Sequence, residues 1–242
     1  MLQKVFDSLF ALTYPQVCHV CRSSSVENLA DGIACRDCWA KTRIFCGREI
    51  LCEKCGAYLR DADAPIETYC HRCDEQFYDR ARAVGIYENA LAASILQLKR
   101  EPFISRNLQK LFISAFPQAG FQNANLIIPV PLSKKRRLER GFNQAEILAA
   151  ILAKETKINL DEKSIVRVVH TPMHRVAMDK KARETTVENA FEVKRQNFIK
   201  DATILLIDDV FTSGATVSNC AQVLKQSGAQ KVYVLTVART IS

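Results

Sequence analysis

The later two thirds of the chain alternate between short apolar runs and stretches whose apolar residues recur at helical spacing. The runs predict buried strands, and the recurring spacing predicts amphipathic helices. We predict strands at 81–87, 126–130, 164–170, 203–210 and 231–238, and helices at 89–100, 142–156 and 216–228. Strands that alternate with helices predict a parallel sheet flanked by helices, whose ligands bind at the carboxyl ends of the strands.

The helix after residue 216 shows the pattern most clearly. Its apolar positions Val217, Cys220, Ala221 and Leu224 fall on one face. Cys220 is therefore expected to be a core residue rather than a reactive thiol. Gly228 is expected to end this helix.

The first residues, MLQKVFDSLFAL, also carry apolar side chains at helical spacing, with Asp7 interrupting them. No small-residue cleavage site follows, so we favour a short packing helix over a signal peptide. No run approaches the ~18 apolar residues that a membrane span requires. We therefore expect a cytoplasmic protein without membrane insertion.

Cysteine changes this picture, because nine of the ten cysteines precede residue 74 and eight of them form Cys-x-x-Cys pairs. The pairs are Cys18/Cys21, Cys35/Cys38, Cys52/Cys55 and Cys70/Cys73. One pair supplies two thiolates to a tetrahedral Zn²⁺, and a second pair completes the shell. The four pairs predict two structural zinc sites. Sequential pairing is the simplest arrangement, and cross-braced pairing is the alternative.

Other interpretations of the cysteines are one zinc with a degenerate second site, disulfides, or redox chemistry. Disulfides belong to oxidising compartments, and redox chemistry needs a single pair. Few large apolar residues accompany the cysteines, so metal binding should supply much of the folding free energy there. Cys46 lies outside the pairs and is expected to be a spare thiol. We predict a helix and double zinc-ribbon-like module over 1–78 and an α/β domain over 79–242.

Charge is divided unevenly between these two parts. Residues 1–78 hold 9 Lys and Arg against 11 Asp and Glu, for a net charge of −2, while 79–242 hold 25 against 15, for +10. A basic second part suits an anionic ligand, either a phosphorylated small molecule or a nucleic acid. A solvated basic surface is the alternative.

The stretch ILLIDDVFTSGAT, at 204–216, joins an apolar strand to a hydroxylic loop that opens a helix. Such a loop can direct backbone N–H groups and hydroxyls at a phosphate on the helix N-terminus, where the helix dipole also favours an anion. Gly214 allows close approach of the backbone. Asp208 and Asp209 can accept hydrogen bonds from ribose hydroxyls, and one can assist a metal ion. A solvated acidic turn before a capped helix is the alternative.

This arrangement resembles the phosphoribosyl-diphosphate (PRPP) signature of type I phosphoribosyltransferases, and the resemblance extends over 79–242. The double Cys₄ module, PVPL, RGFNQ and DDVFTSGAT, in that order, resemble the ComF family over essentially the whole chain. That family is associated with natural competence, the uptake of transforming DNA. The resemblance implies a type I phosphoribosyltransferase-like fold, PRPP or another ribose-5-phosphate compound as ligand, and Mg²⁺ bound with it.

The resemblance also assigns the binding residues. The catalytic positions would be Asp208 and Asp209. The signature loop would hold the 5′-phosphate with Val210, Phe211, Thr212, Ser213, Gly214, Ala215 and Thr216. The 127–144 segment would form the pyrophosphate side, with Lys134, Lys135, Arg136, Arg137 and Arg140. A mobile hood at 171–189 would add Arg175, Lys180, Lys181 and Arg183. His174 and Thr186-Val187 depart from the family pattern, which has Gln and Asn-Val there, so the acceptor is left undefined.

Two functions follow as hypotheses. In the first, the protein transfers phosphoribosyl from PRPP to an unknown acceptor. In the second, it is a non-catalytic PRPP sensor whose basic face binds single-stranded DNA. Its zinc module would then dock a DNA-uptake helicase or channel protein, with Trp39 as an anchor. Few aromatic residues accompany the basic cluster, which weakens the second hypothesis.

Overall fold

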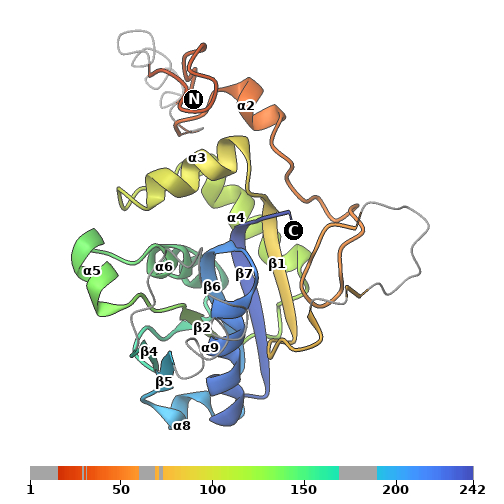
Figure 1. Ribbon diagram of the computed structural model, residues 1–242, viewed down its shortest axis with the longest axis vertical. Helices are drawn as coiled ribbons and strands as arrows, with labels where there is room; N and C mark the ends of the chain where they lie inside the picture. The colour runs from red at the N-terminus through yellow and green to blue at the C-terminus, as the bar shows by residue number, and fades with distance from the viewer. Residues whose placement is uncertain are drawn as a thin grey trace, which may run out of the picture.

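The computed structural model describes residues 16–28, 30, 32–59, 69–70, 73–168 and 190–241. Its centre is a five-stranded sheet of order β1-β7-β6-β2-β3 (Figure 1), in which every neighbouring pair is parallel. The strands are β1 (Arg80–Ile86), β2 (Leu126–Pro129), β3 (Asn159–Leu160), β6 (Thr203–Phe211) and β7 (Lys231–Arg239). The predicted parallel sheet is confirmed.

Helices cover both faces of this sheet. On one face lie α3 (Asn89–Leu98), α4 (Arg106–Gln118) and α6 (Gln144–Thr156), packed against apolar residues that include Leu205 and Leu235. On the other face, α9 (Ala215–Gln226) packs against Ile204 and Leu206. Cys220 is fully buried there, which confirms it as a core residue.

Helix α4 has no counterpart among the predicted elements. Its apolar residues have the spacing of an amphipathic helix: Leu108, Phe112 and Phe116 are buried, and Leu111 and Ala115 pack beside them. The sequence therefore carried a signal for this helix that the predicted elements omit. Ser105 caps the helix, because its hydroxyl accepts a hydrogen bond from Leu108 N at 3.2 Å. The described residues also form three shorter helices: α2 (Arg36–Ala40), α5 (Lys134–Arg140) and α8 (Gln196–Ile199).

The strand predicted at 164–170 does not join the parallel sheet. β4 (Ile165–Arg167) pairs antiparallel with β5 (Phe191–Val193) in a separate two-stranded sheet. Because β3 already pairs with the outer edge of β2, β4 pairs with β5 instead. Residues 169 and 170 lie outside the described residues.

The second cysteine group packs directly on the central sheet. Cys52, Cys55 and Cys73 belong to the same apolar cluster as the α9 face. Ala81 N donates to the carbonyl of Lys54 at 2.7 Å, and a Cβ at Gly56 would lie 2.7 Å from the carbonyl oxygen of Ala81. This close approach therefore requires glycine. The predicted boundary after residue 78 stays a prediction.

The first cysteine group packs elsewhere. Cys18, Cys35 and Cys38 cluster with Ala90 at the start of α3, and Trp39 packs partly against them. In Figure 1 this part of the chain lies beyond α3, away from the second group. Within the described residues, no helix is long and apolar enough to cross a membrane.

Candidate phosphate and zinc sites

The carboxyl ends of β2 and β6 form an uneven edge in the sheet. The last pair between them joins Pro129 and Ile207, whereas β6 continues beside β7 as far as Phe211. From β2 the chain leads outward to β3, and from β6 it leads the other way to β7. In parallel sheets, ligands bind where the connections diverge in this manner. Asp208 and Asp209 lie on the part of β6 that extends beyond β2.

The two carboxylates are close together and half-buried. Asp208 Oδ1 accepts a hydrogen bond from Asp209 N at 2.8 Å, and Asp209 Oδ2 lies 2.9 Å from Lys99 Nζ. Burial, and after it the charge of Asp209, raise the pKa of Asp208 to about 8. One nearby cation therefore does not compensate both carboxylates, and the pair can accept hydroxyl hydrogen bonds or a further cation.

Lys99 was not among the predicted site residues. It directly follows α3, whose apolar face is buried against the sheet, and its side chain returns to the carboxyl end of β6. The sequence signal was a cation at the end of an apolar helix that starts at the carboxyl end of a strand. That signal is weak by itself, because lysine commonly ends helices.

The loop after β6 passes through a left-handed conformation at Gly214. Gly214 has φ +80° and forms the N-cap of α9 without a side chain of its own to cap the helix, while Ala215 N donates to Ser213 Oγ at 3.4 Å. A Cβ at Gly214 would lie 2.7 Å from Cζ of Phe211, so the position requires glycine for both space and conformation. Thr212, Ser213 and Ala215 are exposed around it. The N-terminus of α9 is therefore accessible to an anion.

Three other members of the predicted loop set are less exposed than Thr212, Ser213 and Ala215. Thr216 is half-buried in the first turn of α9, and Val210 is half-buried on β6. Phe211 is buried, with its ring edge-on to Tyr78 at 5.9 Å between centroids. The ring of Phe211 is thus part of the core and is unavailable for stacking on a base.

The basic cluster after β2 forms a short helix rather than a loop. Lys134, Lys135 and Arg140 lie on α5, which has no buried residue and projects from the body of the molecule in Figure 1. Lys135 lies 4.0 Å from Glu139, and Arg137 forms an ion pair with Glu146. These cations follow β2 and so begin at the same edge of the sheet as Asp208.

The RGFNQ motif connects α5 to α6. Gly141 ends α5 in the left-handed conformation at φ +77°. Asn143 caps α6 by accepting from Ala145 N at 3.1 Å, and its Nδ2 donates to the carbonyl of Val130 at 3.0 Å. The motif therefore fixes the turn beside the end of β2. The predicted hood residues Arg175, Lys180, Lys181 and Arg183, and His174 with them, lie outside the described residues.

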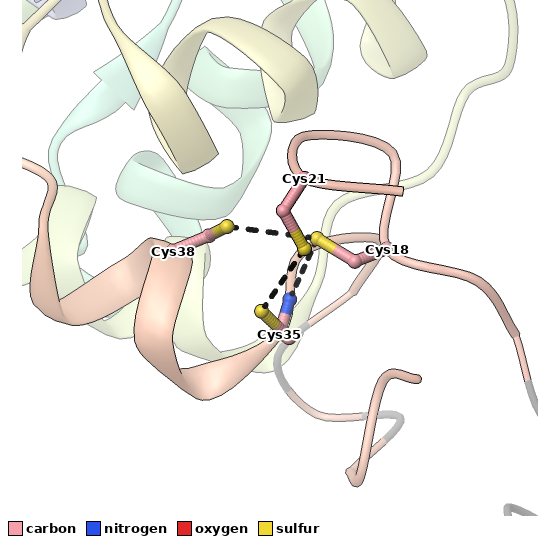
Figure 2. A group of neighbouring side chains, drawn as sticks. All are labelled: Cys18, Cys21, Cys35 and Cys38. Carbon is pink, nitrogen blue, oxygen red and sulfur yellow. Dashed lines mark hydrogen bonds between the residues drawn. The ribbon is translucent and has the colours of Figure 1, made fainter. Parts of the chain in front are cut away.

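The eight paired cysteines gather into two groups of four, in sequential order. Cys18, Cys21, Cys35 and Cys38 form one group (Figure 2), and Cys52, Cys55, Cys70 and Cys73 form the other, with all ligand atoms of a group within 4.8 Å of one another. Sequential pairing is thus confirmed. Every cysteine is a free thiol, and Cys46 is exposed and belongs to neither group.

The sulfur spacing fits zinc. Four sulfurs at ~2.3 Å from one Zn²⁺ lie about 3.8 Å from one another in a tetrahedron. Cys18 and Cys38 are 3.7 Å apart, and Cys21 and Cys35 are 3.9 Å apart. In the second group, the corresponding distances are 3.6 Å for Cys52 and Cys73 and 3.4 Å for Cys55 and Cys70. Four thiolates leave no ligand position for water, so both zinc centres are structural.

Comparison with known proteins supports the zinc-binding module. The double zinc ribbon domain family matches residues 9–74. DNA utilization protein YhgH of Salmonella typhimurium is 30% identical over 238 residues, covering 95% of this chain and 100% of the relative. Competence protein ComFC of Bacillus subtilis is 26% identical over 226 residues, covering 87% and 85%. Among solved structures, the glutamine PRPP amidotransferase of Bacillus subtilis matches with a TM-score of 0.36 and 16% identity. The match covers 70% of this chain and 31% of that one.

The parallel sheet and the two groups of four cysteines define an α/β protein with a double zinc ribbon. The chain is similar to its YhgH relative from end to end of that protein. It belongs to the ComF family.

Proposed function

We propose that the protein binds PRPP at the carboxyl end of β6. The observation that carries this proposal is the continuous unit of Asp208, Asp209 and the Gly214 loop at the divergence of β2 and β6. The exposed N-terminus of α9 would receive the 5′-phosphate, and the two carboxylates would accept hydrogen bonds from the ribose hydroxyls. The ion pair with Lys99 would hold the carboxylate of Asp209 in position for these hydrogen bonds.

The pyrophosphate half would extend toward the cations that follow β2. Lys134, Lys135 and Arg140 on α5 are exposed or half-buried, and Arg183 of the hood is proposed as a further cation on the evidence of sequence alone. Mg²⁺, held by the diphosphate with one of the aspartates, would neutralise part of the leaving charge. These groups favour departure of pyrophosphate because they stabilise negative charge where it develops.

As an enzyme, the protein would transfer phosphoribosyl to an acceptor nitrogen. The nitrogen lone pair would form a bond to C1 of the ribose, the bond from C1 to the pyrophosphate oxygen would break, and pyrophosphate would leave with that electron pair. The names of the relatives, competence protein and DNA utilization protein, support a role in the uptake or use of DNA. We place the protein in the cytoplasm, where PRPP is made and DNA is received.

The experiment that tests catalysis is a screen for pyrophosphate release from PRPP. Nucleobases, small amines and single-stranded DNA serve as acceptors, with Asp209→Asn as the inactive control. Release that depends on one acceptor and disappears in Asp209→Asn is the expected result. If PRPP binds but no acceptor raises release above that of Asp209→Asn, the protein is a sensor of PRPP and not a transferase.

A second function is supported by the exposure of α5. This helix contains four cations in its first four positions and none of its residues is buried, so Lys134, Lys135 and Arg136 can contact a phosphate backbone while Arg137 stays paired with Glu146. In this alternative the helix binds single-stranded DNA, and the first zinc ribbon, where the side chain of Val17 is exposed, docks a helicase or channel protein. Neutralising Lys134, Lys135 and Arg136 should flatten the salt dependence of DNA binding. The same slope in this variant and in Lys154→Ala would exclude α5.

A further inference from the structure

The second cysteine group is connected to the phosphate loop by a short segment of chain. The carbonyl of Cys73 accepts from Gln76 N at 3.2 Å, and Oε1 of Gln76 would lie 3.2 Å from a Cβ at Gly214. The next residue, Phe77, donates its N–H to Ser218 Oγ on α9 at 3.0 Å. The chain that leaves the last zinc ligand therefore lies directly against the loop and the start of its helix.

Arg239, at the end of β7, makes a second connection. Its Nη1 donates to the carbonyl of Cys55, and its Cζ lies 5.2 Å from the ring centroid of Phe211. The Phe211 ring is the group that a Cβ at Gly214 would meet. The Phe211 ring thus lies between Arg239 and Gly214, and its position limits the space available to the loop.

The buried charge of Arg239 needs a counter-charge. Arg239 is only 4% exposed, and burying a guanidinium without a compensating charge is unfavourable. Among the described residues, no carboxylate forms an ion pair with Arg239. A Zn²⁺ with four thiolates would carry a net charge of about −2, and the guanidinium contacts the second group through the carbonyl of Cys55.

We propose that Arg239 is a positioning residue through which the second zinc centre holds the loop 212–216 in the shape that receives a phosphate. The inference rests on the proposed function, because it concerns the same loop. The first zinc centre has a different neighbourhood: its cysteines pack against Ala90 of α3, and none of its described contacts involves the loop. The two centres therefore differ in their expected effect on ligand binding.

The test uses the full-length protein with one ligand removed from either centre. Cys73→Ser and the matched control Cys38→Ser each change the last cysteine of a centre. The readouts are zinc content, PRPP affinity by calorimetry in the presence of Mg²⁺, and hydrogen exchange of the amides at 211–218. We expect each variant to lose one zinc equivalent. Only Cys73→Ser should bind PRPP at least about tenfold more weakly, a difference of ~1.4 kcal/mol, and exchange faster at 211–218.

A second pair of variants leaves the zinc ligands intact. Arg239→Met removes the charge and keeps an apolar stem, and Arg239→Lys retains the charge. Arg239→Met should keep both zincs, bind PRPP more weakly and exchange faster at 211–218, and Arg239→Lys should restore part of both losses. These two variants test the role of Arg239 even if Cys73→Ser does not fold.

The outcomes separate the inference from the proposed function. If the unmodified protein does not bind PRPP, the proposed function fails, and the exchange rates at 211–218 still test the connection to zinc. Unchanged affinity and unchanged exchange in Arg239→Met overturn the inference while PRPP binding by the unmodified protein stands. Equal weakening in Cys38→Ser and Cys73→Ser also overturns it, because the effect would then not be specific to the second centre.

Discussion

The pKa of Asp208 is well above that of an ordinary aspartate, which makes the stability of the protein depend on pH. Burial and the charge of Asp209 raise its pKa to about 8, whereas the same group in the unfolded chain titrates near the ordinary value of 3.8. Between these values the folded protein holds a proton that the unfolded chain has lost. Rising pH therefore lowers the free energy of unfolding through this group up to about pH 8, and has no further effect above it.

Asp208→Asn should remove this dependence. We expect the free energy of unfolding of the variant to exceed that of the unmodified protein by an amount that grows from pH 6 to 8 and then becomes constant. Urea unfolding followed by circular dichroism, with zinc present at each pH, measures the difference. A difference that is the same at pH 6 and pH 8 would show that Asp208 has an ordinary pKa.

Lys99 provides a second test at the residue scale. Lys99→Gln removes the cation 2.9 Å from Asp209, and charge-assisted hydrogen bonds contribute about 1.5–3 kcal/mol. We expect PRPP affinity, measured by calorimetry with Mg²⁺, to fall about tenfold or more. Arg100→Gln is the matched control, because Arg100 is the adjacent, exposed cation. Similar losses in both variants would mean that the general positive charge, and not the contact with Asp209, is what matters.

Among the elements, the turn from β6 into α9 depends most on a single residue. Gly214 and Gly141 have nearly the same left-handed φ, +80° and +77°, but a Cβ at Gly214 meets Phe211 whereas one at Gly141 meets nothing within 4 Å. The left-handed conformation alone costs an alanine about 1–2 kcal/mol. The comparison of the two glycines thus separates the cost of the conformation from that of the contact.

Gly214→Ala should therefore destabilise the protein more than Gly141→Ala, and only Gly214→Ala should weaken PRPP binding strongly. Chemical unfolding and calorimetry on both variants measure the two effects. Equal affinity for PRPP in the two variants would indicate that the loop 212–216 does not contact the ligand.

At this scale the sequence predicted the strands well where apolar residues are consecutive, as in β6. The prediction missed α4 although its apolar residues recur at helical spacing, and it placed β4 in the wrong sheet because strand pairing is not a local property. The cysteine pairs were predictable because ligand spacing is set by zinc geometry. Lys99 was not, because its role arises only when α3 returns its end to β6.

In the whole molecule, the proposed site is supported by the central sheet and by the second cysteine group, which pack against each other. The sheet places Asp208, Asp209 and the loop together, and the second cysteine group packs on the same apolar cluster that supports the loop. The uneven charge of the sequence agrees with an anionic ligand for the basic part, since the cations of α5 remain exposed. Neither charge nor fold identifies an acceptor.

The most direct test of a PRPP site at the end of β6 is a calorimetric titration of PRPP, with and without Mg²⁺. The unmodified protein is compared with Asp208→Ala and Asp209→Ala, after circular dichroism and zinc analysis have shown that each is folded with two zinc equivalents. We predict saturable, Mg²⁺-dependent binding that both substitutions abolish. PRPP affinity that is unchanged in either variant would contradict the assignment of this site.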